Sequence, residues 1–131
     1  MNKSRSLRSP LSRARGLGSA KHGVHHFWVQ RLSAIALIPL SLWFVFSAAM
    51  FARGDYAAVR HWVAAPSVAV ALVLFLGAAT YHSALGVQVV IEDYVASDAG
   101  KLAVLILSKF AHLIVAAAGI FAVLRIALPT G

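Results

Sequence analysis

The sequence predicts an all-α membrane protein with three transmembrane helices. Of its 131 residues, 60% are hydrophobic and only 12% are charged, whereas a water-soluble domain carries roughly 25% charged residues. Three apolar stretches are each long enough to cross a bilayer, for which about 20 residues suffice. These stretches are rich in Ala and Leu and show no alternation of apolar and polar residues, so helices are favoured over strands.

The three stretches form one transmembrane anchor domain, residues 32–131, behind a basic tail, residues 1–31. The predicted spans are approximately 32–52, 63–91 and 102–128. Pro39 lies inside the first span and predicts a kink, because it removes a backbone N–H from the helix ladder. Pro66 fits the first turn of the second span, where a missing N–H costs little.

Positive charge is concentrated in the tail, and its position predicts the orientation of the chain. Residues 1–31 contain seven of the twelve Lys and Arg residues and no acid. Since loops rich in Lys and Arg stay in the cytoplasm, the N-terminus and the 92–101 loop are expected there. The 53–62 loop and the C-terminus are then expected on the opposite side. Because the basic residues are followed directly by the uncharged apolar stretch 32–52, we interpret the tail as membrane-proximal and expect no nucleic-acid partner.

The chain has no cysteine, which excludes disulfides, thiolate metal sites and a covalently attached c-type haem. Any metal or cofactor must be held by histidine, by carboxylate or by shape.

His82 is the one histidine or charged residue in the second predicted span. It lies roughly 15 Å along the helix from Asp93, where lipid offers a polar group no partner. Ala78 and Gly86 flank it on the same helix face and leave room for a large, flat group. Three interpretations follow: a hydrogen bond between helices, ligation of a haem iron, or a proton relay.

The third predicted span contains Lys109 and His112, with Arg125 near its exit. His112 follows Lys101 by eleven residues, so on antiparallel helices it lies at nearly the depth of His82. A haem held by both histidines of this chain is therefore geometrically conceivable. The long side chain of Lys109 is expected to extend toward the cytoplasmic headgroups.

Two sequence segments resemble a known family. The pattern from His82 to Val95, HSALGVQVVIEDYV, resembles the second-helix signature of the small hydrophobic membrane anchor of succinate dehydrogenase, respiratory complex II. Residues 23–35, GVHHFWVQRLSAI, resemble the Gly-Val-His and Arg-x-Ser/Thr-Ala segment that precedes the first span in that family. The resemblance covers about residues 22–128, including the spacing of the three spans.

The resemblance implies a partner and a shared cofactor. In this family the hydrophobic anchor packs with a second three-helix anchor, which is of the cytochrome b556 type, and the pair holds one haem b in a bacterial inner membrane. His82 matches the haem iron ligand, and Arg31 and His25 match residues near the haem propionates. His112 has no counterpart in this pattern, which makes it a residue of a helix interface unless both histidines of this chain bind the iron.

The same resemblance implies a quinone site and two soluble partners. Tyr94 matches the tyrosine that donates to a ubiquinone carbonyl, and Asp93 matches the acid beside it. From the residues alone, Tyr94 could also be an interfacial aromatic anchor. A flavoprotein with FAD and an iron–sulfur subunit would oxidise succinate and pass electrons to ubiquinone, as a step of the respiratory chain and the tricarboxylic acid cycle. No succinate-oxidising chemistry is expected on this chain.

A second function is compatible with the same residues. A small three-helix transporter or scaffold protein could use its histidines to relay protons or to pack helices. Transporters often pair Gly or Pro interruptions in corresponding halves of the chain, and no such pair is found in the sequence.

Overall fold

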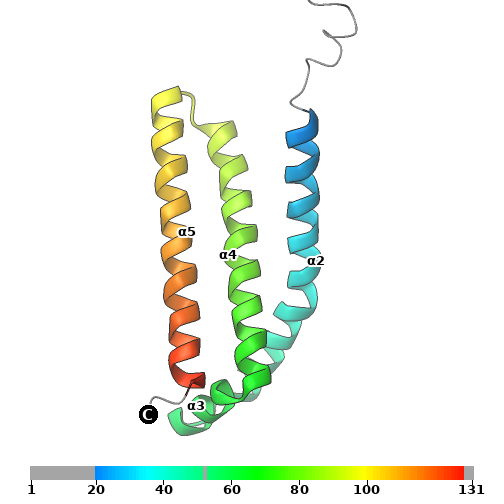
Figure 1. The fold of residues 1–131 in the computed structure, drawn as a ribbon, viewed down its shortest axis with the longest axis vertical. Helices are drawn as coiled ribbons and strands as arrows, with labels where there is room; N and C mark the ends of the chain where they lie inside the picture. Colours follow the sequence, from blue (N-terminus) through cyan, green and yellow to red (C-terminus); the bar gives the residue numbers. More distant parts are fainter. Residues whose placement is uncertain (1–19, 52, 129–131) are drawn as a thin grey trace, which may run out of the picture.

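The computed structural model describes residues 20–51 and 53–128, and this part of the chain contains helices but no strand. The four helices are α2 (Ala20–Phe51), α3 (Tyr56–Ala64), α4 (Pro66–Tyr94) and α5 (Asp98–Ala127). They are shown in Figure 1. The predicted all-α fold class is confirmed.

Three of these helices are long and apolar enough to cross a membrane: Val24–Phe51 within α2, all of α4 and all of α5. Successive long helices run in opposite directions, so the start of α2 and the end of α5 lie at opposite ends of the bundle (Figure 1). The end of the bundle that contains the last residue of α4 is called the Tyr94 end below. Which end faces the cytoplasm remains a prediction from the charges.

The first helix begins earlier than the predicted span. α2 starts at Ala20 rather than near residue 32, and its membrane-compatible part starts at Val24. Arg31 therefore lies within α2 and not at its beginning. The basic residues before residue 32 suggested a boundary, but a helix continues through Lys and Arg, whose long side chains can extend toward the headgroups. Residues 1–19 of the predicted tail lie outside the described residues.

Most of the segment predicted as the 53–62 loop belongs to a short helix, α3, which ends at Ala64, so α4 begins at Pro66 rather than near the predicted residue 63. Asp55 caps it by accepting a hydrogen bond from the backbone N–H of Ala58 at 2.7 Å, as is usual for an N-cap residue. Trp62 of α3 stacks obliquely on Trp43 and Phe51 of α2, with ring centroids 5.9 and 5.1 Å apart. These rings attach α3 to the end of α2.

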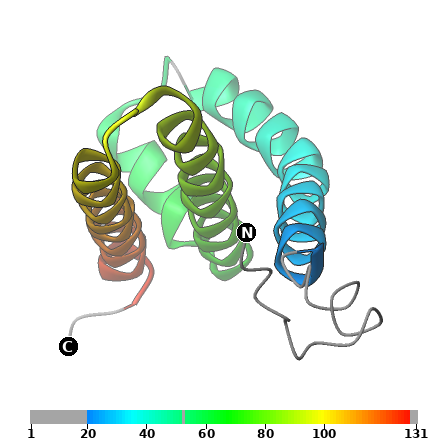
Figure 2. The ribbon, with the colours of Figure 1, turned by 90° about the horizontal axis from the view of Figure 1, so that it is seen from above.

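The two prolines act at the positions that the sequence indicated. Pro66 is the first residue of α4. Pro39 lies inside α2, which remains one continuous helix but is visibly bent (Figures 1 and 2). A short link, residues 95–97, joins α4 to α5, and Ser97 caps α5 by accepting from the N–H of Gly100 at 3.2 Å.

The three long helices form an open row with α4 between α2 and α5 (Figure 2). The rings of Phe44 on α2 and Phe75 on α4 stack with centroids 4.8 Å apart. On the other side of α4, a Cβ placed at Gly119 of α5 would lie 3.3 Å from Cδ1 of Leu76. Glycine thus permits the close approach of α4 and α5, as small residues do in membrane bundles.

Little of the described chain is buried by the chain itself. Among the residues that the structure describes, only Ala69, Leu72 and Ile91 are buried apolar residues, and large apolar side chains are exposed along all three long helices. Such a surface is stable against lipid or against another apolar protein, and not against water.

Candidate functional site

His82 lies on α4 where that helix packs against α2. Its Nδ1 is 3.0 Å from the hydroxyl oxygen of Ser33 on α2, and the same hydroxyl donates to the backbone carbonyl of Gln30 at 2.9 Å. The other ring nitrogen, Nε2, has no hydrogen-bond partner among the described residues and is not enclosed by them. His82 therefore has one nitrogen held within the bundle and one available to a group outside it.

The helix face beside His82 is open at Gly86. Gly86 follows His82 by one turn, and a Cβ built there would meet no atom within 4 Å. On the other side of the imidazole, one turn earlier, the small residue Ala78 is half-buried. On this face, the space beside Gly86 is not filled by the described side chains of this chain.

His112 on α5 is arranged differently. Its Nδ1 is 2.8 Å from the backbone carbonyl of Ser108, one turn earlier, and its Nε2 is 3.2 Å from the hydroxyl of Ser83 on α4. Both ring nitrogens are thus engaged within the chain. His82 lies in the interface between α2 and α4. His112 lies in the interface between α4 and α5. The two histidines therefore belong to different helix interfaces.

Asp93 and Tyr94 are the last two residues of α4. Both side chains are exposed, and Tyr94 is 84% exposed. One turn earlier, the side-chain amide of Gln88 donates to the carboxylate of Glu92 at 2.8 Å, which orders the polar side chains of this last stretch. The phenol of Tyr94 is therefore presented outward at the end of a membrane-spanning helix.

Arg31 and His25 are both exposed on α2, between the level of His82 and the Tyr94 end. The guanidinium of Arg31 lies 5.1 Å from the ring centroid of Phe27, one turn closer to the start of the helix. This cation–π contact directs the charge of Arg31 toward the Tyr94 end, which is the direction expected of an arginine that meets anionic groups near the membrane boundary.

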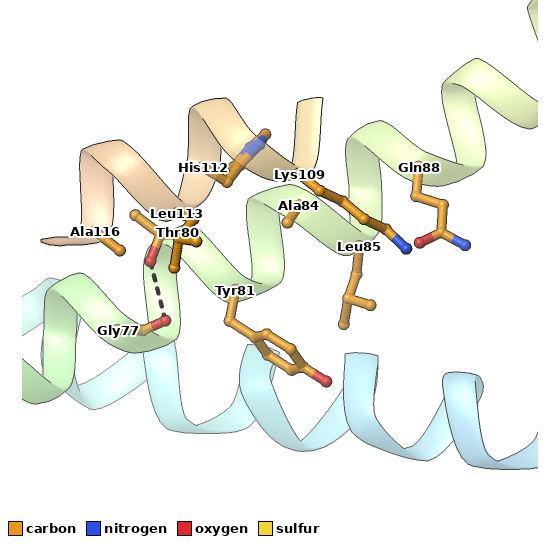
Figure 3. A pocket seen from close by; sticks show the side chains of 10 residues that line it. All are labelled: Gly77, Thr80, Tyr81, Ala84, Leu85, Gln88, Lys109, His112, Leu113 and Ala116. Atoms are coloured by element: carbon orange, nitrogen blue, oxygen red, sulfur yellow. Dashed lines mark hydrogen bonds between the residues drawn. The ribbon is translucent and has the colours of Figure 1, made fainter. Parts of the chain in front are cut away.

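A groove of about 530 Å³ runs between α4 and α5 (Figure 3). Its lining is mostly apolar, and its polar side chains are Thr80, Tyr81, Gln88, Lys109 and His112. The side chain of Lys109 extends along the groove toward Gln88, and so toward the Tyr94 end, as its length led us to expect (Figure 3). His82 does not line this groove.

Two polar residues near the site were not identified from the sequence. Ser33 was part of the resembling segment but had no predicted role, although it forms the hydrogen bond to His82. His26 has a buried Nε2 without a hydrogen-bond partner in the described residues. His26, Gln30 and Ser33 follow one another at spacings of four and three residues, and this helical spacing was the available signal that they share a face.

The fold and the site together define a multi-pass helical membrane subunit with a polar helix face that it does not cover itself. Comparison with known proteins identifies the group. The family model described as the succinate dehydrogenase/fumarate reductase transmembrane subunit matches residues 5–123.

Curated relatives agree with this match, and each is named as a succinate dehydrogenase hydrophobic membrane anchor subunit. The chain is 32% identical over 117 residues to the subunit from Rickettsia bellii, covering 89% of this chain and 94% of that protein. It is 29% identical over 120 residues to the subunit from Paracoccus denitrificans, covering 92% of each chain. It is 33% identical over 90 residues to the subunit from Rickettsia conorii, covering 68% of this chain and 71% of that protein.

The chain therefore belongs to the succinate dehydrogenase/fumarate reductase transmembrane subunit family, as a multi-pass membrane anchor subunit of the bacterial inner membrane. An anchor subunit acts in association with the other subunits of its complex. The alternative interpretation, a small transporter or scaffold protein, is thereby set aside.

Proposed function

We propose that this anchor subunit supplies one axial ligand, His82, to a haem b that it shares with a second three-helix anchor subunit. We further propose that Asp93 and Tyr94 contribute to a ubiquinone-reduction site at the Tyr94 end. A flavoprotein with FAD and an iron–sulfur subunit would deliver the electrons taken from succinate. When bound, the haem would supply a one-electron redox centre between the two anchor subunits.

The observation that supports haem ligation is the free Nε2 of His82 beside an open helix face. Neutral imidazole binds haem iron through one nitrogen while the other is hydrogen-bonded, and His82 has this division of roles. The absence of any atom within 4 Å of a Cβ built at Gly86 would leave room for the edge of a flat macrocycle. His112 lacks a free nitrogen. Within this chain, His82 is thus the better of the two candidate ligands.

The observation that supports the quinone role is the exposure of Tyr94 at the end of α4. Ubiquinone must keep its tail in lipid while its carbonyls receive protons, so its site belongs at a membrane boundary. Tyr94 would donate a hydrogen bond to one carbonyl and stabilise the negative charge that develops there during reduction. Asp93 would help orient the site and connect it to protons from the aqueous side.

Arg31 would bind an anionic propionate of the haem. We expect Arg31→Leu to lower the haem content of the purified complex, because an unpaired carboxylate near the membrane boundary is costly. The measurement is haem per complex from the absorption spectrum. Arg60→Leu, on α3 at the opposite end, is the matched control and should keep full haem. Equal haem content in both variants would count against the role of Arg31.

We expect this chain to be unstable or free of haem when it is expressed without its partners, because its described part buries so little of its own surface. The test is affinity purification of the tagged chain in detergent, with and without co-expression of the other subunits. The complete complex should yield four subunits and a reduced-minus-oxidised spectrum of a low-spin b-type haem. A monodisperse, haem-loaded preparation of the lone chain would contradict a shared haem and favour ligation by His82 and His112 together.

A further inference from the structure

We infer that Ser33 is a positioning residue for His82: its hydroxyl fixes the imidazole as the Nδ1–H tautomer, directs Nε2 out of the bundle and lowers the reduction potential of the haem. This inference rests on the proposed ligation of haem iron by His82. It concerns a residue of α2 that carries no charge and has no role in the proposed chemistry otherwise.

The tautomer follows from the number of protons on the serine. A hydroxyl has one proton to donate and can accept further hydrogen bonds. With Ser33 Oγ donating to the carbonyl of Gln30 at 2.9 Å, it accepts in its 3.0 Å contact with His82 Nδ1. Nδ1 then carries the proton, and in a neutral imidazole Nε2 carries the lone pair. That lone pair is what an iron ligand requires.

The position of this hydrogen bond makes it strong. Ser33 follows the start of α2 by 13 residues and His82 precedes the end of α4 by 12, so both lie roughly 18–20 Å along their helices from the Tyr94 end. The contact is partly buried between two helices, at a depth where neither water nor lipid offers an alternative partner. Loss of the hydroxyl would leave the Nδ1–H of His82 without an acceptor.

The hydrogen bond also has an electronic consequence. An acceptor on the far N–H of a metal-bound histidine fixes the ring orientation and raises the basicity of the ligating nitrogen. A more basic ligand stabilises ferric iron more than ferrous iron, which lowers the reduction potential. Because the Ser33 hydroxyl itself donates to Gln30, its oxygen is polarised into a better acceptor.

His112 shows why the tautomer alone does not make a ligand. Its Nδ1 faces a backbone carbonyl, which can only accept, so Nδ1 carries the proton there too. Its Nε2, however, lies 3.2 Å from the Ser83 hydroxyl and accepts from it. The two histidines share a tautomer, and of the two His82 alone has an Nε2 without a partner among the described residues.

The test is a redox titration of the haem in the purified four-subunit complex, comparing Ser33→Thr with Ser33→Val. Threonine and valine have nearly the same shape, and a helical threonine can still bond the preceding carbonyl. Ser33→Thr should keep the potential of the parent complex. Ser33→Val should raise it and should weaken haem retention about tenfold. If that loss falls on the ferric form alone, it corresponds to about 59 mV for a one-electron couple.

Two further variants keep the test decisive. Ser41→Ala removes another α2 hydroxyl that donates to backbone carbonyls but contacts no histidine, and it should leave the potential unchanged. If Ser33→Val does not assemble, Ser33→Cys replaces the hydroxyl by a weaker acceptor and should give a smaller rise. Potentials equal to the parent in both Ser33→Val and Ser33→Cys would overturn the inference, as would a rise in Ser41→Ala equal to that in Ser33→Val.

The outcome for His82 separates this inference from the proposed function. If His82→Ala keeps the low-spin spectrum, the proposed ligation fails and the role of Ser33 fails with it. If His82→Ala removes that spectrum while the Ser33 variants keep the parent potential, only the role of Ser33 is rejected.

Discussion

In the assembled complex, Tyr94→Phe is expected to lower the rate of ubiquinone reduction about a hundredfold or more. Removing one preorganised donor to a developing oxyanion typically costs about 2.7–4 kcal/mol in the transition state. The substitution keeps the aromatic ring and deletes only the hydroxyl, so it separates hydrogen-bond donation from anchoring at the interface. Since the side chain is 84% exposed in this chain, the loss of the hydroxyl should not disturb the bundle.

The measurement compares two electron acceptors in the same preparation. Succinate oxidation with an artificial acceptor that takes electrons at the flavoprotein should remain at the level of the parent complex, while ubiquinone reduction falls. Tyr81→Phe is the matched control, because Tyr81 is also an exposed tyrosine of α4 but lies away from the end of the helix. Full ubiquinone reductase activity in Tyr94→Phe would leave Tyr94 as an interfacial aromatic residue.

His82→Ala is expected to abolish or strongly perturb the low-spin haem spectrum of the complex. Of His82 and His112, only His82 has a ring nitrogen, Nε2, without a partner among the described residues, and this variant removes it. His112→Ala is the matched control and should keep the spectrum, because both nitrogens of His112 are engaged within the chain. His112→Ala should instead weaken the packing of α4 against α5, measurable as a lower melting temperature of the complex.

Assembly must be measured together with the spectrum. The amount of each subunit in the preparation, measured by gel electrophoresis, distinguishes loss of haem from loss of the complex. If both histidine variants lose the spectrum equally while all subunits remain, the assignment of one ligand to each anchor protein is wrong, and the iron is held by both histidines of this chain.

The fold class was predictable because it depends on long runs of one kind of residue. Three apolar stretches of this length leave no alternative to three spans, and Pro66 marked the beginning of α4 correctly. The short helix α3 was not predictable in the same way. Its nine residues include Arg60 and His61, and what holds it is the stacking of Trp62 on rings of α2, which is a contact distant in sequence.

The site was predictable only in part. His82 is conspicuous because it is the one histidine or charged residue of the predicted span 63–91, whereas its partner Ser33 is an ordinary helix residue. The pairing was also concealed by the late start predicted for the first span, which would have put Ser33 at the membrane surface and His82 well below it. Once α2 begins at Ala20, the two residues lie at the same depth.

His82 and Tyr94 lie on the same unbroken helix, α4. The helix geometry therefore fixes the distance and the angle between these two residues. Tyr94 follows His82 by twelve positions, a rise of roughly 18 Å. Inserting or deleting one residue between them would turn one side chain by about 100° relative to the other and shift it by about 1.5 Å. The proposed haem iron and the proposed quinone could then no longer both be reached by these two side chains in their present positions. Related subunits should accordingly tolerate substitutions at the lipid-facing positions of residues 83–93 while keeping the length of this segment constant.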